Sequence, residues 1–117
     1  MKLPNHENAV VPQSKVTDYL LSFKHRDGRG KAQFFTRLGF SIDSWETLAK
    51  TLLGHATNHH VTKIEKTLFG TRYVIEGAIH TPDGRYPIIC SVWFVETGES
   101  IPRFVTAYPF RQKGVKK

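Results

Sequence analysis

The run Ile101–Pro109 brings a hydroxyl group, a phenol and a cation together near the carboxyl end of the chain, in Thr106, Tyr108 and Arg103. Hydroxyl groups can orient a phosphate through hydrogen bonds, and a guanidinium can neutralise its charge. A Tyr-Pro strand end is also a common structural closure, in which the phenol is half buried and hydrogen-bonded. The run therefore predicts either a phosphate-binding strand or an ordinary edge of the fold.

A basic loop, Lys24–Lys31, supplies the second set of reactive side chains. Cleavage of RNA through the ribose 2′-hydroxyl needs a base, a cation that stabilises the phosphorane and an acid that protonates the leaving oxygen. An imidazole such as that of His25 can serve as base or acid near neutral pH, and Lys31 and Arg29 can neutralise phosphate. No metal ion or other cofactor is obligatory for this chemistry, and none is expected. The alternative for such a charge run is a solvated turn.

Four further side chains could bind a metal or act as a nucleophile. His55 and His59 lie four residues apart with His60 beside them, but the glutamate of the His-Glu-x-x-His motif and a cysteine pair are both missing. These histidines are instead expected to cap the end of a helix. Cys90 lies in an apolar run and is typical of a small core residue. We therefore predict no metal site.

Composition limits the class of protein. A chain of 117 residues is long enough for one domain with a modest core, so a single domain over residues 1–117 is expected, with an extended lead-in over 1–11 and a flexible basic tail over 111–117. Seventeen Lys and Arg against ten Asp and Glu give a net charge of +7, which favours polyanionic partners or simply solubility.

Compartment is indicated by two features of the sequence. The single cysteine permits no intrachain disulfide and favours a reducing cytosol, so a cytoplasmic protein is predicted. No apolar run approaches the length that spans a bilayer and no signal peptide is recognisable, so no membrane partner is expected.

The first half of the chain has helical periodicity. A short helix is predicted from Pro12 to Leu21, with Ser14 as a cap and a buried stripe of Val16, Tyr19 and Leu20. A second helix is predicted from residue 30 or 31 to 38, ending at a left-handed Gly39. A third is expected over residues 44–58, capped by Ser44 and apolar on one face.

The second half changes to strand patterns. We predict strands over residues 61–66, 72–80, 86–96 and 101–109, with a tight turn at Pro82-Asp83-Gly84. Residues 86–95 are apolar on both faces and predict a central strand. Alternation in the last strand would place Phe104, Thr106 and Tyr108 on one face and Arg103, Val105 and Ala107 on the other. The predicted class is α+β, with about three N-terminal helices packed on one face of a C-terminal antiparallel four-stranded meander.

The chain resembles an uncharacterised bacterial family of unknown function over residues 3–109. In the helical half the resemblance is carried by Leu3-Pro4-Asn5, Ala9-Val10-Val11, Lys15, Tyr19-Leu20-Leu21, His25, Gly30-Lys31-Ala32, Phe35 and Leu38-Gly39. In the sheet half it is carried by Arg72-Tyr73-Val74, Gly84-Arg85, Ser91-Val92-Trp93 and the run from Pro102 to Tyr108. This family implies no reaction.

The order of helices before a meander that closes on Val105–Pro109 also resembles the toxin superfamily of barnase, EndoU, colicin nucleases and RelE-like proteins. That resemblance implies a metal-independent ribonuclease, used in a toxin–antitoxin pair or as the warhead of a polymorphic toxin. The positions that match are His25, Lys31, Thr106 and Tyr108. A catalytic histidine on the sheet, which some members carry, has no clear equivalent, although His80 could fill the role in a shifted register.

The leading hypothesis is a metal-independent endoribonuclease toxin that a small acidic antitoxin or immunity protein neutralises. Its catalytic residues would be His25 for proton transfer, Lys31 and Arg103 as phosphate-stabilising cations, and Thr106 and Tyr108 as positioning groups. The residues expected to bind RNA beside them are Arg26, Arg29, Arg72 and Arg85.

Two other functions are consistent with the same residues. One is a non-catalytic basic module that binds nucleic acid or an acidic protein, which the lack of a clear acid–base pair favours. The other is an immunity protein or antitoxin, which the charge of +7 counts against.

Overall fold

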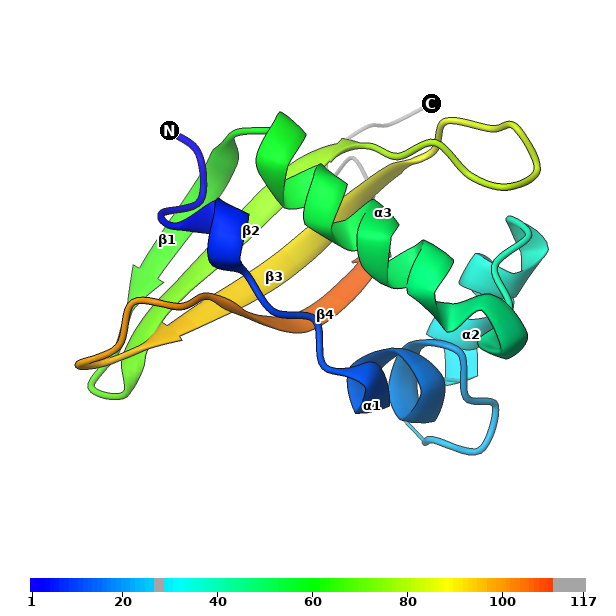
Figure 1. Ribbon diagram of the computed structural model, residues 1–117, viewed down its shortest axis with the longest axis horizontal. Coiled ribbons are helices and arrows are strands. Elements are labelled where there is room, and N and C mark those ends of the chain that lie inside the picture. Colours follow the sequence, from blue (N-terminus) through cyan, green and yellow to red (C-terminus); the bar gives the residue numbers. More distant parts are fainter. Residues whose placement is uncertain (27–28, 111–117) are drawn as a thin grey trace, which may run out of the picture.

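Helices cover one face of an antiparallel sheet in the computed structural model (Figure 1), which describes residues 1–26 and 29–110. The four strands follow one another in space as they do in the sequence. Their bounds are Val61–Lys66 (β1), Gly70–Ala78 (β2), Ile88–Glu96 (β3) and Arg103–Pro109 (β4). The predicted α+β class and the four-stranded meander are confirmed. The predicted tail, 111–117, lies outside the described residues.

β3 is a central strand, as its two apolar faces predicted, because it pairs with β2 on one side and β4 on the other. It ends at Glu96 as predicted but begins two residues later, since Tyr86 and Pro87 precede the strand and Tyr86 is exposed. The turn at Pro82-Asp83-Gly84 is confirmed. Gly84 has a φ of 85°, and its N–H donates to the Thr81 carbonyl at 2.9 Å.

α3 (Trp45–Asn58) lies across the sheet and provides most of the helical cover (Figure 1). Leu48, Leu52 and Ala56 recur at helical spacing and are fully buried against the sheet. The predicted cap by Ser44 is wrong, because its side chain makes no capping hydrogen bond. The chain enters α3 through a single 3-10 turn, Ile42–Ser44, which takes the place of a side-chain cap.

α2 (Arg29–Arg37) ends in the left-handed glycine that the sequence predicts. Gly39 has a φ of 101°, its N–H donates to Thr36, and the N–H of Phe40 donates back to Phe35 at 3.2 Å. The rings of Phe35 and Phe40 pack edge to face with centroids 6.1 Å apart. This is a Schellman motif with its usual apolar contact, and it fixes the direction in which the chain leaves α2.

The first α-helix is shorter than predicted and continues as a wider, π-helical turn. α1 covers only Gln13–Lys15 and passes into one turn of π-helix, Val16–Leu20. Pro12 stands before the helix, and Ser14 lies inside it without capping it, so the predicted cap is wrong. Val16 and Leu20 are buried as expected, whereas Tyr19 is only half buried, at the margin of the core.

The predicted alternation along β4 is wrong because the strand contains a bulge. Val92 pairs with Thr106 but Trp93 pairs with Phe104, which leaves Val105 as the extra residue. Phe104 therefore packs with the core beneath the helices, while Tyr108 packs on the opposite face with Val74, Cys90 and Val92. The bulge directs Tyr108 away from Phe104 and onto the face that α3 leaves open.

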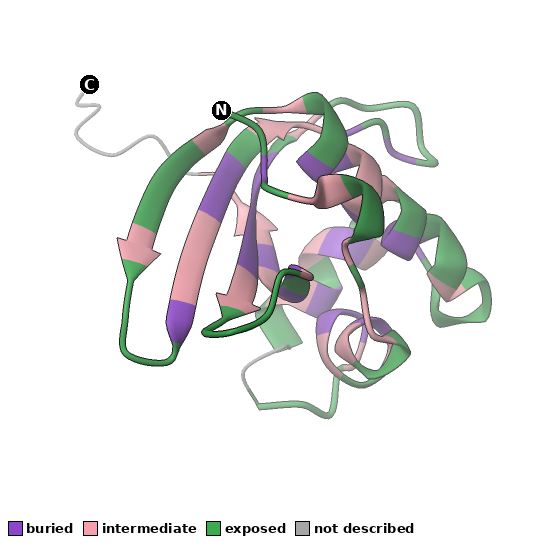
Figure 2. Ribbon diagram, turned by 60° about the vertical axis from the view of Figure 1, so that its left-hand side comes forward, coloured by how far each residue is buried: buried purple, intermediate pink, exposed green. Residues whose placement is uncertain are grey.

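Buried residues lie on the strands and on the helices that cover them (Figure 2). Trp93 and Phe104 are both buried, and their rings are in edge-to-face contact. Trp93 is fully buried, so its predicted role in the core is confirmed. The opposite face of the sheet carries a much smaller cluster of three buried residues, Val74, Cys90 and Val92. That face is where the sheet is hollowed.

Candidate functional site

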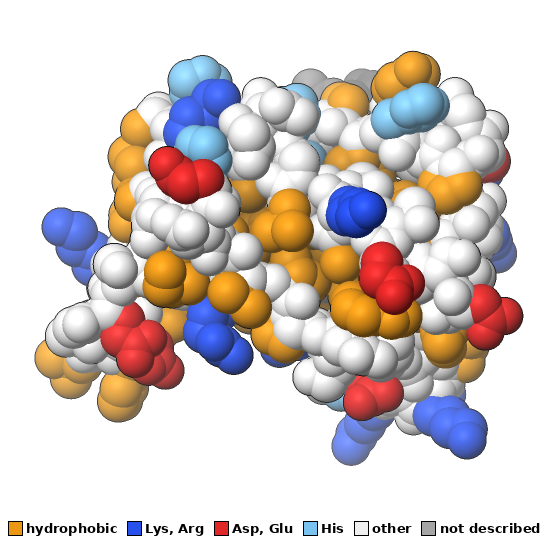
Figure 3. Space-filling model, viewed as in Figure 1, with side chains coloured by type: hydrophobic (Ala, Val, Ile, Leu, Met, Phe, Trp, Pro, Cys, Tyr) orange, Lys and Arg blue, Asp and Glu red, His pale blue; other side chains and the backbone are white. Residues whose placement is uncertain are grey.

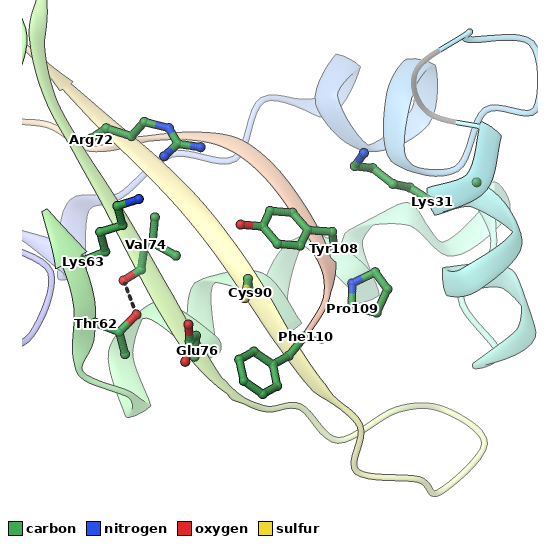
Figure 4. A pocket seen from close by; sticks show the side chains of 11 residues that line it. Lys31, Thr62, Lys63, Arg72, Val74, Glu76, Cys90, Tyr108, Pro109 and Phe110 are labelled. Carbon is green, nitrogen blue, oxygen red and sulfur yellow. Dashed lines mark hydrogen bonds between the residues drawn. The ribbon is translucent and has the colours of Figure 1, made fainter. Parts of the chain in front are cut away.

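A concave pocket of about 830 Å³ lies on the face of the sheet opposite to α3 (Figure 4). All four strands contribute to it, and the first turn of α2 closes one side. We call it the open-face pocket. Its lining residues are Gly30, Lys31, Thr62, Lys63, Arg72, Val74, Glu76, Cys90, Tyr108, Pro109 and Phe110. It is large enough for a nucleotide and contains three cations, a phenol and a carboxylate.

A row of polar side chains crosses the floor of the pocket from strand to strand. Glu76 on β2 pairs with Cys90 on β3, and Cys90 pairs in turn with Tyr108 on β4. Side chains of paired residues stand side by side on one face of a sheet. The register therefore places a carboxylate, a thiol and a phenol in line, as Figure 4 shows.

Burial keeps both the phenol and the thiol protonated. The pKa of Tyr108 is raised chiefly by burial and further by its neighbour Cys90. Burial also raises the pKa of Cys90, and the charge of Glu76 adds to this effect. Tyr108 can therefore donate a hydrogen bond at neutral pH, whereas Cys90 is a poor nucleophile because the reactive form of cysteine is the thiolate.

Two cations stand over β1 and β2 at one side of the pocket. Arg72 contacts the carboxylate of Glu65 at 2.8 Å and Lys63 contacts it at 3.2 Å. Hydrogen bonds from Lys63 and then Arg72 lower the pKa of Glu65. These exposed ion pairs are weak, so an incoming phosphate can take over both cations.

The third cation, Lys31, reaches the pocket from α2 and stands across Tyr108 from Arg72 (Figure 4). The Lys31 ammonium also lies 5.7 Å from the ring centre of Tyr19, whose hydroxyl shares a 2.9 Å hydrogen bond with Thr106. The ring of His25 contacts the same tyrosine edge-on at 4.9 Å. The structure thus brings together Lys31, His25 and Thr106 around a tyrosine that the sequence had assigned to the core.

The other predicted residues lie outside the pocket. Arg103 is exposed at the start of β4, where its backbone bridges to Val10. Arg85 donates to Asp83 at 2.6 Å in the β2–β3 turn and to the carbonyl of Arg37. Arg26 and Arg29 are exposed beside the undescribed residues 27–28. Of the four predicted RNA-binding arginines, the pocket includes Arg72.

Sequence reasoning missed Glu76, Lys63 and Phe110 as pocket residues. A signal for Glu76 was present, because it is a charged residue in a strand whose neighbours on the same face, Val74 and Ala78, are uncharged. Lys63 follows a bulge between Val61 and Lys63 that shifts the register of β1. Only the strand pairing shows that Glu76 and Lys63 lie on the same face of the sheet as Tyr108.

His55 has a structural role and does not cap α3 as a cation. It is 2% exposed, and burial lowers its pKa to about 4. Its Nε2 lies 3.0 Å from the Gly77 carbonyl and its Nδ1 lies 2.7 Å from the Ser91 hydroxyl. The carbonyl can only accept, so Nε2 carries the proton and Ser91 donates to Nδ1. The expectation of an imidazolium is therefore wrong here.

The described residues offer neither a metal site nor a membrane-spanning helix. No group of three or more His, Cys, Asp or Glu side chains in residues 1–26 and 29–110 is arranged to hold a metal ion. No helix within the same ranges combines the length and the apolar character that crossing a bilayer requires.

Charged side chains on the α3 face are arranged differently from those in the pocket. Lys and Arg side chains lie apart from one another on that face, among acidic and hydrophobic ones (Figure 3). In the open-face pocket, by contrast, Lys31, Lys63 and Arg72 converge on one hollow. The pocket is therefore the better anion-binding surface of the two.

Comparisons with known proteins bear on both resemblances. A family model described as "Domain of unknown function (DUF6883)" matches residues 2–111. A search of curated proteins found no match. Among solved structures, a chain of the "Contact-dependent growth inhibition toxin - immunity protein complex from Klebsiella pneumoniae 342" is similar, with a TM-score of 0.68 and 22% identity over 87% of this chain and 100% of that chain. The likeness shows a shared fold.

Proposed function

This chain belongs to the DUF6883 family, whose function is unknown, and we propose that it is a ribonuclease toxin that cleaves RNA in the open-face pocket. The observation that carries the proposal is the meeting of Lys31 from the helical half with Arg72 and Tyr108 from the sheet. These side chains offer two cations and a hydroxyl donor to one phosphate. Such an arrangement stabilises the charge that develops on a phosphorane.

In the proposed reaction the ribose 2′-oxygen attacks the adjacent phosphorus and the 5′-oxygen leaves. Glu76 is the carboxylate that lines the pocket, and we assign it the removal of the 2′-hydroxyl proton. Tyr108 donates a hydrogen bond to a non-bridging oxygen. His25, which lies beyond Lys31 against Tyr19, is our candidate for returning a proton to the leaving oxygen.

The test is cleavage of single-stranded RNA by the purified protein in the presence of a chelator. We expect products with 2′,3′-cyclic phosphate ends from RNA and no cleavage of a 2′-O-methyl version of the same strand. Glu76→Gln should slow cleavage by about 10²- to 10⁴-fold, the usual contribution of a general base. Lys31→Ala should slow it strongly as well.

Lys50→Ala is the matched control for Lys31→Ala, because Lys50 is exposed on α3 and its substitution removes the same charge from the protein. Equal cleavage by the wild type, Glu76→Gln and Lys31→Ala would contradict the proposal. Cleavage that depends on Lys31 and His25 but not on Glu76 would move the base to His25 and leave the pocket as the site.

A binding module is the second candidate, and one observation favours it. No histidine stands among the described residues that line the open-face pocket, so the pocket holds cations in excess of acid–base groups. If RNA stays intact while binding weakens steeply with salt, this function replaces the nuclease.

We further propose an acidic protein as the natural inhibitor of this chain. The similar solved structure is a complex of a toxin with its immunity protein, and a partner that covers the cations of the pocket would have to be acidic. Co-expression of a small acidic protein encoded beside this chain should block cleavage. The block should weaken when Lys63 and Arg72 are replaced by glutamine.

A further inference from the structure

Five side chains from four separate parts of the chain meet at the edge of the sheet beside β4. They are Lys15, Tyr19, His25, Lys31 and Thr106, and we call them the Tyr19 cluster. The ammonium groups of Lys15 and Lys31 lie 5.4 and 5.7 Å from the centre of the same ring. Lys31 belongs both to this cluster and to the open-face pocket.

The two lysines of the cluster are half buried, and no carboxylate of the described residues forms an ion pair with either. Asp18, next to Tyr19, accepts its hydrogen bond from Thr17 instead. A cation over an aromatic face gains only about 0.5–1 kcal/mol at an exposed site. Two like charges are thus held around one ring, and neither is paired with a carboxylate of the described residues.

The position of Tyr19 is fixed at its hydroxyl group and at its backbone. Its hydroxyl shares a hydrogen bond with Thr106 on β4, and its backbone belongs to the π-helical turn closed by the 2.9 Å bond from the Leu21 N–H to the Val16 carbonyl. Isolated π-turns are frequent at functional sites, because the wider turn displaces side chains from their helical positions. The ring therefore holds both lysines in set places.

We propose that Lys15 and Lys31, held over Tyr19, bind a second phosphate of the RNA backbone next to the phosphate in the open-face pocket. The inference rests on the proposed function and extends it: a bound single strand runs out of the pocket over Lys31 to Lys15. Consecutive phosphates are then bound at two sites that share one lysine. The ligand class is a single-stranded oligonucleotide that has at least one phosphate beyond the scissile one.

The experiment measures binding of uncleavable 2′-O-methyl oligoribonucleotides, a dinucleotide and an octanucleotide, across a salt series. Lys15→Gln should weaken binding of the octanucleotide and reduce its salt slope by about 0.7, the value for one phosphate contact on a single strand. Binding of the dinucleotide, which fills only the pocket, should not change. Lys15→Arg should restore octanucleotide binding, because arginine keeps both the charge and the contact with the ring.

Lys50→Gln is the matched control, since it lowers the net charge equally from α3. An equal effect of Lys15→Gln and Lys50→Gln would overturn the subsite, and so would equal weakening of both oligonucleotides. Tyr19→Phe keeps the ring and should retain most binding, whereas Tyr19→Leu should match Lys15→Gln once thermal melting shows that it is folded.

The binding experiment tests this subsite separately from the nuclease proposal, because the 2′-O-methyl strands cannot be cleaved. Length-dependent binding through Lys15 without any RNA cleavage would keep the subsite and reject the nuclease. Cleavage of RNA together with an unchanged salt slope in Lys15→Gln would keep the nuclease and reject the subsite. A wild type that binds neither oligonucleotide would overturn both.

Discussion

His55 links the helical layer to the sheet through one directed chain of hydrogen bonds. The Trp93 indole donates to Ser91 at 2.9 Å, Ser91 donates to His55 Nδ1, and His55 Nε2 donates to Gly77. Each buried polar atom in this chain has a partner only while the imidazole is neutral. A second proton on His55 would make Nδ1 a donor, and the buried Ser91 hydroxyl would lose the acceptor for its own proton.

Stability should therefore fall in acid because of His55. Its pKa is about 4 in the folded protein against 6.5 for an ordinary histidine, so the unfolded chain binds more protons between these values. The contribution of His55 is fully present above about pH 6.5 and is lost as the pH falls towards 4. The loss amounts to about 3 kcal/mol of unfolding free energy, at 1.4 kcal/mol per pH unit.

Urea denaturation of the wild type and His55→Gln at a series of pH values isolates this effect from other titrating groups. The variant should be less stable at neutral pH, since it loses two buried hydrogen bonds. Its unfolding free energy should, however, fall less steeply as the pH is lowered. His59, whose ring lies 5.0 Å from that of His55, is retained in both proteins. Parallel curves for the two proteins would show that another group causes the acid sensitivity.

Tyr108 should matter for activity and hardly for folding. Tyr108→Phe removes the hydroxyl that is proposed to bind a phosphate oxygen, while the ring keeps its packing against Cys90 and Val92. A hydrogen bond to a charged group contributes about 1.5–3 kcal/mol, so cleavage should slow by about 10- to 100-fold.

Tyr86→Phe makes the same chemical change at an exposed tyrosine that stacks on His80 outside the pocket. Cleavage rates and melting temperatures of both variants provide the check. A loss of activity that is equal in the two variants would remove Tyr108 from the proposed site.

At the scale of elements, the glycine that follows α2 and the tight turn between β2 and β3 were the most predictable features. Gly39 and the turn at Pro82-Asp83-Gly84 were correct because each depends on backbone conformations that glycine and proline favour locally. The bulge in β4 and the π-turn at Val16–Leu20 were missed. Both depend on how distant segments pack, which local residue preferences do not specify.

The candidate site was predictable only in part for the same reason. Lys31 and Tyr108 were selected for their chemistry, and both line the open-face pocket. Arg103 was chosen as a cation on the same strand as Thr106 and Tyr108, and the structure places it away from the pocket. Glu76 shows the converse: its chemistry was visible, but its neighbours become known only from the pairing of β2 with β3.

The β1–β2 hairpin should tolerate no side chain at Gly70. Its φ is 154°, and a Cβ atom there would overlap the Val95 carbonyl oxygen and the ring of Phe94. Gly70→Ala should cost about 2 kcal/mol or more, because the overlapping oxygen belongs to the backbone of β3 and cannot move aside. Gly98→Ala is the control, since Gly98 has a φ of 86° but open space around it.

Gly98→Ala should therefore show only the conformational cost of about 1 kcal/mol. Denaturant midpoints compare the two directly. A Gly70→Ala protein as stable as Gly98→Ala would mean that the strand register near Val95 adjusts readily.

At the scale of the whole molecule, the positions of the cations should matter more for RNA binding than the net charge. The net charge of +7 attracts any polyanion, but the open-face pocket focuses three cations of the described residues on one hollow. The two contributions can be separated by removing equal charge from opposite faces of the sheet. Lys31 and Arg72 represent the pocket. Lys50 on α3 and Lys66 on β1, one residue beyond the Glu65–Arg72 pair, represent the other face.

The double variant Lys31→Gln/Arg72→Gln should lose most RNA affinity, and its salt slope should fall by about 0.7, the value for the one phosphate that both cations are proposed to bind. Lys50→Gln/Lys66→Gln has the same net charge and should lose far less, since its cations do not converge on a strand. Fluorescence titration with an uncleavable single strand measures both quantities. Equal losses of affinity in the two double variants would mean that the net charge of the protein holds the RNA. The pocket would then be rejected as the binding site.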